Sequence, residues 1–232
     1  MAFGFKSEDE LQEYLEKLGT EYKFSCFKEN NSEGCHLLGD YLEAVKKDFV
    51  SAIKVFKSNC DDNKHGKSCF KYANFTYLGK GCEINKRTSF DYYKKACDLN
   101  YMEGCLHSGV ILTAPDKNPK DGCTVVELDY PAGLKYLEKA CSGGNPTACY
   151  FASSICITGA EGVSQDKAKA AKLSQTACDG GNIYACMNLS RMYTKGDGVE
   201  LDQTKANMFK EKAREIRDDM RKKAPIGLQQ GS

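Results

Sequence analysis

The eleven-residue stretch "KACDLNYMEGC" (Lys95–Cys105) decides the fold, because closely related stretches occur twice more along the chain. These are "KACSGGNPTAC" (Lys139–Cys149) and "TACDGGNIYAC" (Thr176–Cys186). Each has a cysteine at the end of a helix-like segment, a central part containing turn-forming residues, and a second cysteine. The recurrence indicates that the chain is built from repeated structural units.

Ten of the thirteen cysteines fall into five close pairs. The first two pairs have eight residues between their cysteines, and the other three have seven. The pairs are Cys26 and Cys35, Cys60 and Cys69, Cys97 and Cys105, Cys141 and Cys149, and Cys178 and Cys186. Successive pairs begin 34, 37, 44 and 37 residues apart. A period of this length is typical of helical repeat arrays.

Each repeat contains two segments with the periodicity of an amphipathic helix. The segment before the second cysteine pair places Phe49, Ile53 and Phe56 at helical spacing. After each pair a second helical segment follows, such as "ACMNLSRMYTKGDG", which ends in glycines suited to a helix C-terminus. No alternating run is long enough to predict a sheet. We therefore predict an all-α fold, an α/α solenoid of about five helix–turn–helix repeats.

The predicted domain organisation is a single solenoid over residues 1–232 with three departures from the regular repeat. A capping helix at 7–27 begins with the capping box Ser7-x-x-Glu10. An insertion at 113–131 carries three prolines. We interpret it as a tolerated surface loop, with a docking element as the alternative. Residues 224–232 are expected to form a flexible tail.

The spacing within each cysteine pair requires a turn. Two cysteines eight positions apart on one straight helix would have Cα atoms about 12 Å apart, and a disulfide tolerates no more than about 7 Å. We therefore expect the chain to reverse between them, so that each bond joins adjacent repeats and contributes about 2–3 kcal/mol. The expected structural disulfides are Cys26–Cys35, Cys60–Cys69, Cys97–Cys105, Cys141–Cys149 and Cys178–Cys186.

Three other roles for the paired cysteines fit the pattern less well. Zinc sites favour closer spacings such as C-x₂-C, which this chain lacks, so no metal site is predicted. The same absence argues against a thioredoxin-type active site. Buried free thiols would suit a reducing compartment, but they do not explain why a pair recurs at every joint.

Three cysteines remain outside the pairs. Cys156 lies in the apolar segment "FASSICITG" and is predicted to be a small core residue. Cys82 lies in the glycine turn "GKGCEIN", and Cys123 lies in the insertion. Both are candidates for redox chemistry, since an exposed thiol can take part in disulfide exchange.

Composition narrows the functional class and the compartment. A net charge of +1 gives no electrostatic footprint for nucleic acid, and no run approaches the length of a transmembrane helix. The N-terminus "MAFGFKSEDELQEYLEKLG" shows neither a secretion signal nor an Arg-rich transit pattern. Thirteen cysteines nevertheless favour an oxidising compartment. The mitochondrial intermembrane space, entered without a cleaved presequence, fits both expectations.

The unit "GVxxDxxKAxxxxxxAC", followed by a Gly/Asn turn and "AC", resembles the Sel-like repeat, a relative of the tetratricopeptide repeat. Over nearly the whole chain, segments such as "YLGKGCEIN" and "CMNLSRMYTKGDGV" are similar to the mitochondrial cytochrome c oxidase assembly factor 7 family. The resemblance implies an intermembrane-space protein needed to build respiratory complexes, chiefly complex IV. Its implied partners are respiratory complex subunits, other assembly factors and the oxidative import machinery. The twin C-x₉-C signature of many intermembrane-space proteins is absent.

Several functions remain open on the sequence alone. The first is a non-enzymatic assembly factor that binds client proteins, and the second is a thiol–disulfide oxidoreductase acting on oxidase subunits. No cofactor is expected, although a haem- or copper-handling factor could use His36, His65, His107 or the six methionines. A hydrolase is disfavoured because the S-x-x-K matches at Ser25, Ser51, Ser68 and Ser164 lack the S-D-N and K-T-G motifs.

Overall fold

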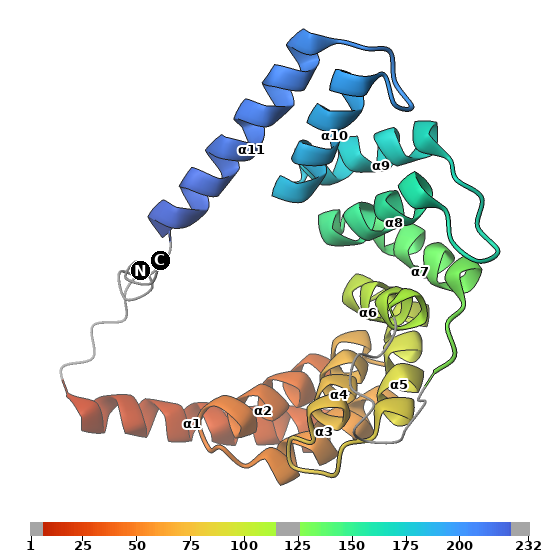
Figure 1. Cartoon of the computed structure of the whole chain (residues 1–232). Helices are drawn as coiled ribbons and strands as arrows, with labels where there is room; N and C mark the ends of the chain where they lie inside the picture. Colours follow the sequence, from red (N-terminus) through yellow and green to blue (C-terminus); the bar gives the residue numbers. More distant parts are fainter. Residues whose placement is uncertain (1–6, 115–125, 224–232) are drawn as a thin grey trace. The chain divides into compact units, whose positions relative to one another are not determined.

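The computed structural model describes residues 7–114 and 126–223, and within them the chain folds as a succession of α-helices (Figure 1). The single extended feature there is an isolated bridge between Ala160 and Val163. The predicted all-α, disulfide-stapled repeat fold is confirmed. The helices are α1 (Glu8–Phe27), α2 (Ser32–Ala44), α3 (Phe49–Asp61), α4 (Gly66–Leu78), α5 (Lys86–Asp98), α6 (Met102–Thr113), α7 (Tyr130–Ser142), α8 (Pro146–Thr158), α9 (Lys167–Asp179), α10 (Ile183–Lys195) and α11 (Gln203–Lys223).

The chain forms two compact units, Met1–Gly104 and Cys105–Ser232, called here the first and second units. The boundary falls within α6. Most of the predicted insertion at 113–131 and the whole predicted tail at 224–232 lie outside the described residues. The interpretation of residues 1–232 as one solenoid stays a prediction.

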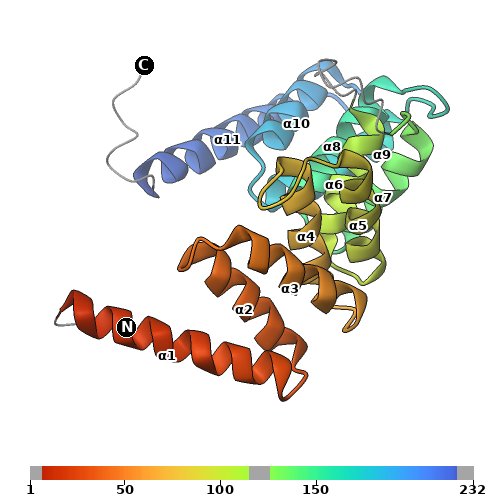
Figure 2. The same ribbon diagram turned by 90° about the horizontal axis from the view of Figure 1, so that it is seen from below.

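In the first unit, consecutive helices from α1 to α5 pack against each other in chain order (Figure 2). Ala52, Phe56 and Phe75 form one buried cluster, and the Phe56 and Phe75 rings meet edge to face with centroids 5.5 Å apart. Leu38 and Tyr41 of α2 belong to a second cluster. The apolar stripes seen in the sequence therefore face the core, where burial stabilises the stack.

In the second unit, α7 packs on α8, α8 on α9, α9 on α10 and α10 on α11. Ala148 and Ala152 on α8 are fully buried, and small side chains at these positions let neighbouring helices approach closely. Helix α11 buries Ala206, Phe209 and Ala213 along one stripe. The second unit therefore uses the same packing device as the first.

Polar side chains begin most of these helices. At each such start, the residue before the helix accepts the backbone N–H of a residue three positions later. At the start of α1, Oγ of Ser7 accepts the N–H of Glu10 at 3.2 Å. The other caps of this kind are Asn31, Asp48, His65, Asn85, Asp129, Asn145, Asp166, Asn182 and Asp202. Asp and Asn recur because their short side chains reach the unpaired N–H groups of the first turn.

Close helix crossings depend on glycine. A Cβ atom at Gly39 of α2 would lie 2.4 Å from the Phe56 ring, and one at Gly109 of α6 would lie 2.6 Å from Leu137. Because these partners are buried core side chains, they have no free space into which to move. The two glycines therefore set how closely their helices pack.

Gly39→Ala is expected to destabilise the first unit by about 1–3 kcal/mol, since the added methyl group displaces the buried Phe56 ring. Urea unfolding followed by circular dichroism measures the change. Glu13→Ala, at an exposed position of α1, serves as the control and is expected to change stability by less than about 0.5 kcal/mol. Equal stability of Gly39→Ala and the wild type would contradict the packing argument.

Candidate functional site

Disulfides close alternate joints between successive helices. The Cα atoms are 4.3 Å apart in Cys26–Cys35 and 4.7 Å apart in Cys60–Cys69. In the second unit, the distances are 4.6 Å in Cys141–Cys149 and 4.7 Å in Cys178–Cys186. Cys97 and Cys105 are also disulfide-bonded. The short Cα distances require the chain reversal that the spacing predicts.

Each reversal contains a residue in the left-handed region of backbone space. Glycine serves in two joints of the second unit, and asparagine, which tolerates this region better than most residues, serves in two joints of the first. Lys64 is the exception. The residues are Asn30, Lys64, Asn100, Gly144 and Gly181, with φ of 52°, 53°, 59°, 88° and 87°.

The disulfide-bonded cysteines lie in the core. Cys60, Cys69, Cys178 and Cys186 have no exposed surface. An attacking thiolate must reach a sulfur atom to exchange a disulfide, so burial protects these bonds. Their geometry is that of a structural frame rather than of a redox centre.

The two unpaired cysteines within the described residues are poor nucleophiles. Cys82 is half-buried, and its Sγ lies 3.6 Å from the carbonyl oxygen of Phe75. Burial raises the pKa of the Cys82 thiol, and it also raises that of Cys156, which is 2% exposed. A raised pKa lowers the thiolate fraction, opposite to the direction that redox catalysis requires. Cys123 lies outside the described residues.

A buried polar cluster connects α2, α3 and α4 around the hydroxyl group of Ser68. Its Oγ lies 3.1 Å from Nδ1 of His36 and 3.0 Å from Nδ1 of His65. Asn59 donates an Nδ2 hydrogen to the same oxygen over 2.7 Å. Oε2 of Glu33 lies 3.1 Å from Nε2 of His65. His36 of α2, Asn59 of α3 and the cap residue His65 thus meet at Ser68 of α4, and Glu33 of α2 joins the cluster through His65.

The helix cap at His65 fixes the proton positions in this cluster. Nδ1 of His65 accepts the backbone N–H of Ser68 over 3.3 Å. This nitrogen therefore carries no hydrogen, and Nε2 donates to Glu33. The Ser68 hydroxyl has no exposed surface and accepts from Asn59. A substrate cannot reach it, which weakens the hydrolase alternative at this S-x-x-K match.

His36 is kept neutral by its surroundings. Burial lowers the pKa of His36, while the carboxylate of Asp40, with Oδ2 3.5 Å from Nε2, acts in the opposite direction. His107 is also shifted, since burial lowers its pKa. Within residues 7–114 and 126–223, no group of three or more His, Cys, Asp or Glu side chains could hold a metal ion. The cofactor expectations stay predictions.

The sequence analysis names His36 and His65 as candidate ligands, but it does not predict that they lie close together in the fold. Their ring centroids are 5.1 Å apart. The repeat period aligns His36, one residue after Cys35, with Phe70, one residue after Cys69. His65 instead occupies the cap position, where Asn31 stands in the preceding repeat. Because the two histidines hold different places in the repeat, no periodic signal links them.

Comparison with known families identifies the repeat. Residues 66–101, 123–145, 146–182 and 183–215 match the Sel1 repeat family. The structure of a Sel1 repeat protein from Oxalobacter formigenes is similar with a TM-score of 0.68 and 22% identity, covering 89% of this chain and 83% of that one. This likeness concerns the fold alone, which is that of a Sel1 repeat protein.

Curated relatives narrow the class further. The cytochrome c oxidase assembly factor 7 homolog of Drosophila melanogaster is 39% identical, covering 100% of this chain and 98% of the relative. Cytochrome c oxidase assembly factor 7 of Xenopus tropicalis is 37% identical, covering 91% of this chain and 90% of the relative. The chain belongs to the cytochrome c oxidase assembly factor 7 family. Among the described residues, no helix has both the length and the apolar character needed to cross a bilayer.

Cysteine alkylation counts the disulfides directly. The denatured, unreduced protein is expected to take up three alkyl groups, because ten of its thirteen cysteines are in the five pairs. Reduction before alkylation should raise the number to thirteen. Intact-mass spectrometry measures both values. More than three groups on the unreduced protein would mean fewer than five disulfides and would contradict the frame.

The His36 environment predicts acid sensitivity in the first unit. Because the folded state lowers the pKa of His36 below its ordinary value of 6.5, the unfolded chain binds this proton more readily. The contribution of His36 to stability is therefore complete above about pH 6.5 and declines as the pH falls through the lower, folded-state pKa. His65, Glu33, Asp40 and Lys67 also act on this imidazole.

Urea unfolding at pH 7.5 and pH 5.5 tests this dependence. The His36→Met variant places an apolar side chain where the last cysteine-paired repeat has Met187. We expect the variant to lose less stability between the two pH values than the wild type does. An identical loss in both proteins would show that His36 makes no net contribution to the acid sensitivity.

Proposed function

We propose that this chain is an assembly factor for cytochrome c oxidase and that it acts by binding proteins rather than by catalysis. The observation that carries the proposal is the similarity, over nearly full length, to relatives named as assembly factors of that complex. The repeat architecture supports it, because helical repeat proteins present extended surfaces to partners. The proposed partners are oxidase subunits or other assembly factors.

The proposed location is the mitochondrial intermembrane space. Support comes from the disulfides of the described residues, which persist in oxidising compartments, together with the names of the relatives. In this proposal, the oxidative import machinery of that compartment forms the disulfides. Folding and retention then result from the same reaction, since the stapled helices form a stable frame.

The oxidoreductase alternative has less support from the thiols. Cys82 and Cys156 both have raised pKa values because of burial. The remaining described cysteines are held in disulfides. A scaffold needs none of these thiols to react, whereas an oxidoreductase needs at least one accessible thiolate. The two functions therefore differ in how they depend on the spare cysteines.

Depletion and rescue in cells test the proposal. Depletion of the protein is expected to lower the amount of assembled cytochrome c oxidase on native gels, and the wild-type chain should restore it. A Cys82→Ser/Cys123→Ser/Cys156→Ala variant should restore it equally, because a scaffold needs no free thiol. An unchanged oxidase level after depletion would overturn the assembly role. Failure of the triple variant, despite normal abundance, would favour the oxidoreductase.

A further inference from the structure

The second unit contains a cavity of about 700 Å³ beside α6 and α8. This volume is within the range of small-molecule binding pockets and is large enough for a bulky side chain. Its walls come from the end of α6, the start of α7, the C-terminal part of α8 and the turn that follows α8. The lining residues that matter most are Val110, Tyr130, Phe151, Ile155 and Glu161.

Three of the four side-chain hydroxyl groups in the wall donate hydrogen bonds to nearby backbone carbonyl oxygens. Thr113 donates to the carbonyl oxygen of Gly109 at 2.8 Å, and Ser154 donates to that of Tyr150 at 3.0 Å. Thr158 donates to the carbonyl oxygen of Gly159 at 2.9 Å. These side chains therefore have their hydroxyl hydrogens engaged, and the cavity favours an apolar occupant.

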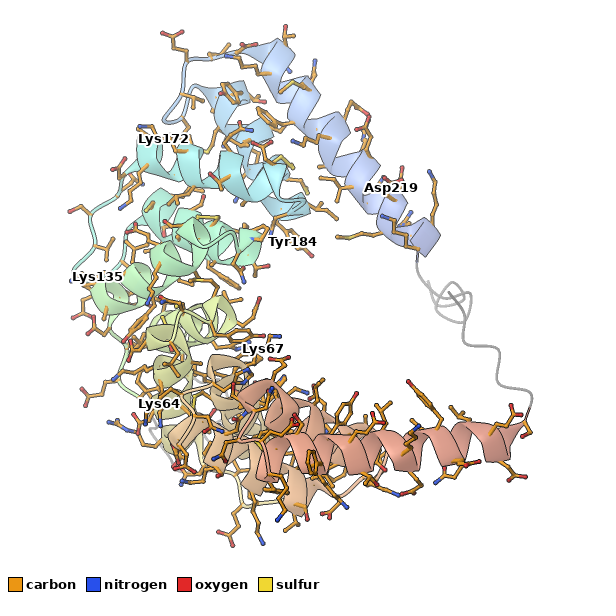
Figure 3. The ribbon with its side chains drawn as sticks, turned by 180° about the vertical axis from the view of Figure 1, so that it is seen from behind. Lys64, Lys67, Lys135, Lys172, Tyr184 and Asp219 are labelled. Atoms are coloured by element: carbon orange, nitrogen blue, oxygen red, sulfur yellow. A yellow bond between two sulfur atoms is a disulfide. The ribbon has the colours of Figure 1, made fainter. Side chains whose placement is uncertain are left out.

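An aromatic surface continues from the cavity onto α10. The Phe151 ring, 36% exposed, lies 5.6 Å from that of Tyr150, and the Tyr150 ring lies 5.9 Å from that of Tyr184. Tyr184 is 66% exposed and lies in the first turn of α10 (Figure 3). Exposed Tyr and Phe side chains are enriched at protein–protein interfaces. Of these three rings, Phe151 lines the cavity and the other two adjoin it; the cavity together with these rings is called the groove below.

Glu161 gives this groove a negative charge. It is exposed and has no ion-pair partner among the described residues. Two other acidic side chains of the second unit do have a cationic partner: Glu138 pairs with Lys169 at 2.6 Å. Asp197 likewise pairs with Lys167 at 2.6 Å. An uncompensated carboxylate beside an apolar cavity is complementary to a positive charge on an apolar ligand.

We propose that this groove binds a peptide segment of a partner protein in which a bulky apolar side chain is flanked by Lys or Arg. The apolar side chain enters the cavity between Val110, Phe151 and Ile155. The cationic side chain pairs with Glu161. The proposal deepens the proposed function, on which it rests, by naming the surface and the chemistry of the client segment.

Two model peptides provide the probe. Both are labelled 14-residue peptides with leucine at the same positions, and the remaining positions are lysine in one and glutamate in the other. Fluorescence anisotropy with the oxidised full-length protein measures their affinities. We expect the lysine peptide to bind at least about tenfold more tightly, because Glu161 attracts one peptide and repels the other.

Matched variants test whether the peptides bind at this groove. Glu161→Lys should weaken binding of the lysine peptide by about fivefold and reduce or reverse the preference for it over the glutamate peptide. Glu200→Lys, at another exposed glutamate, should change neither. Phe151→Ala should weaken both peptides by at least about fivefold. Leu201→Ala, at an exposed apolar position outside the cavity lining, should leave both affinities within twofold of the wild type.

Three results would contradict the proposal that this groove binds the peptide segment. The first is equal binding of the two peptides, and the second is an equal effect of Glu161→Lys and Glu200→Lys. The third is binding that appears only when a Gly/Ser linker replaces residues 115–125, which would make that segment the occupant. The peptide measurement does not involve the oxidase. If the peptides do not bind but the wild-type chain fully rescues depleted cells, only the proposal about the groove is contradicted. If the wild-type chain fails to rescue, the assembly role is contradicted.

Discussion

Alternate joints between successive helices depend on a disulfide, and four of them bring two cysteine Cα atoms within 5 Å over eight or nine positions of sequence. A continuous helix would hold them about 12 Å apart. The chain therefore has to stop, reverse and restart within a few residues. Three features occur together at each of these joints: a residue in the left-handed region, an Asn or His cap on the following helix, and buried sulfur atoms.

Much of the fold could be predicted from the sequence because the relevant signals are local and repeated. Spacing alone placed the reversals, and the apolar stripe through Phe209 and Ala213 of α11 is buried as its periodicity indicates. The close approach of Gly39 to Phe56 could not be predicted in the same way. It depends on the crossing of two helices, and one glycine in a helical pattern has several possible meanings.

The candidate sites also include some features that the sequence predicts and others that it does not. The four disulfides described here follow from residue spacing, whereas the cluster at Ser68 joins residues that hold unrelated places in the repeat. The groove was also beyond sequence reasoning. Its apolar character depends on which hydroxyl groups bond to their own helices, and its charge depends on Glu161 being left unpaired where Glu138 is not. Such properties arise from three-dimensional neighbours.

The four described disulfides have a topological consequence. Each links cysteines only eight or nine positions apart, and none encloses another. A protease cut between two of these short rings would therefore leave no covalent link across the cut from any of the four. The rings hold each turn shut, but the connection between neighbouring turns depends on the intact backbone and on packing. Interlaced disulfides would keep a nicked chain in one piece, whereas these allow it to come apart without a reductant.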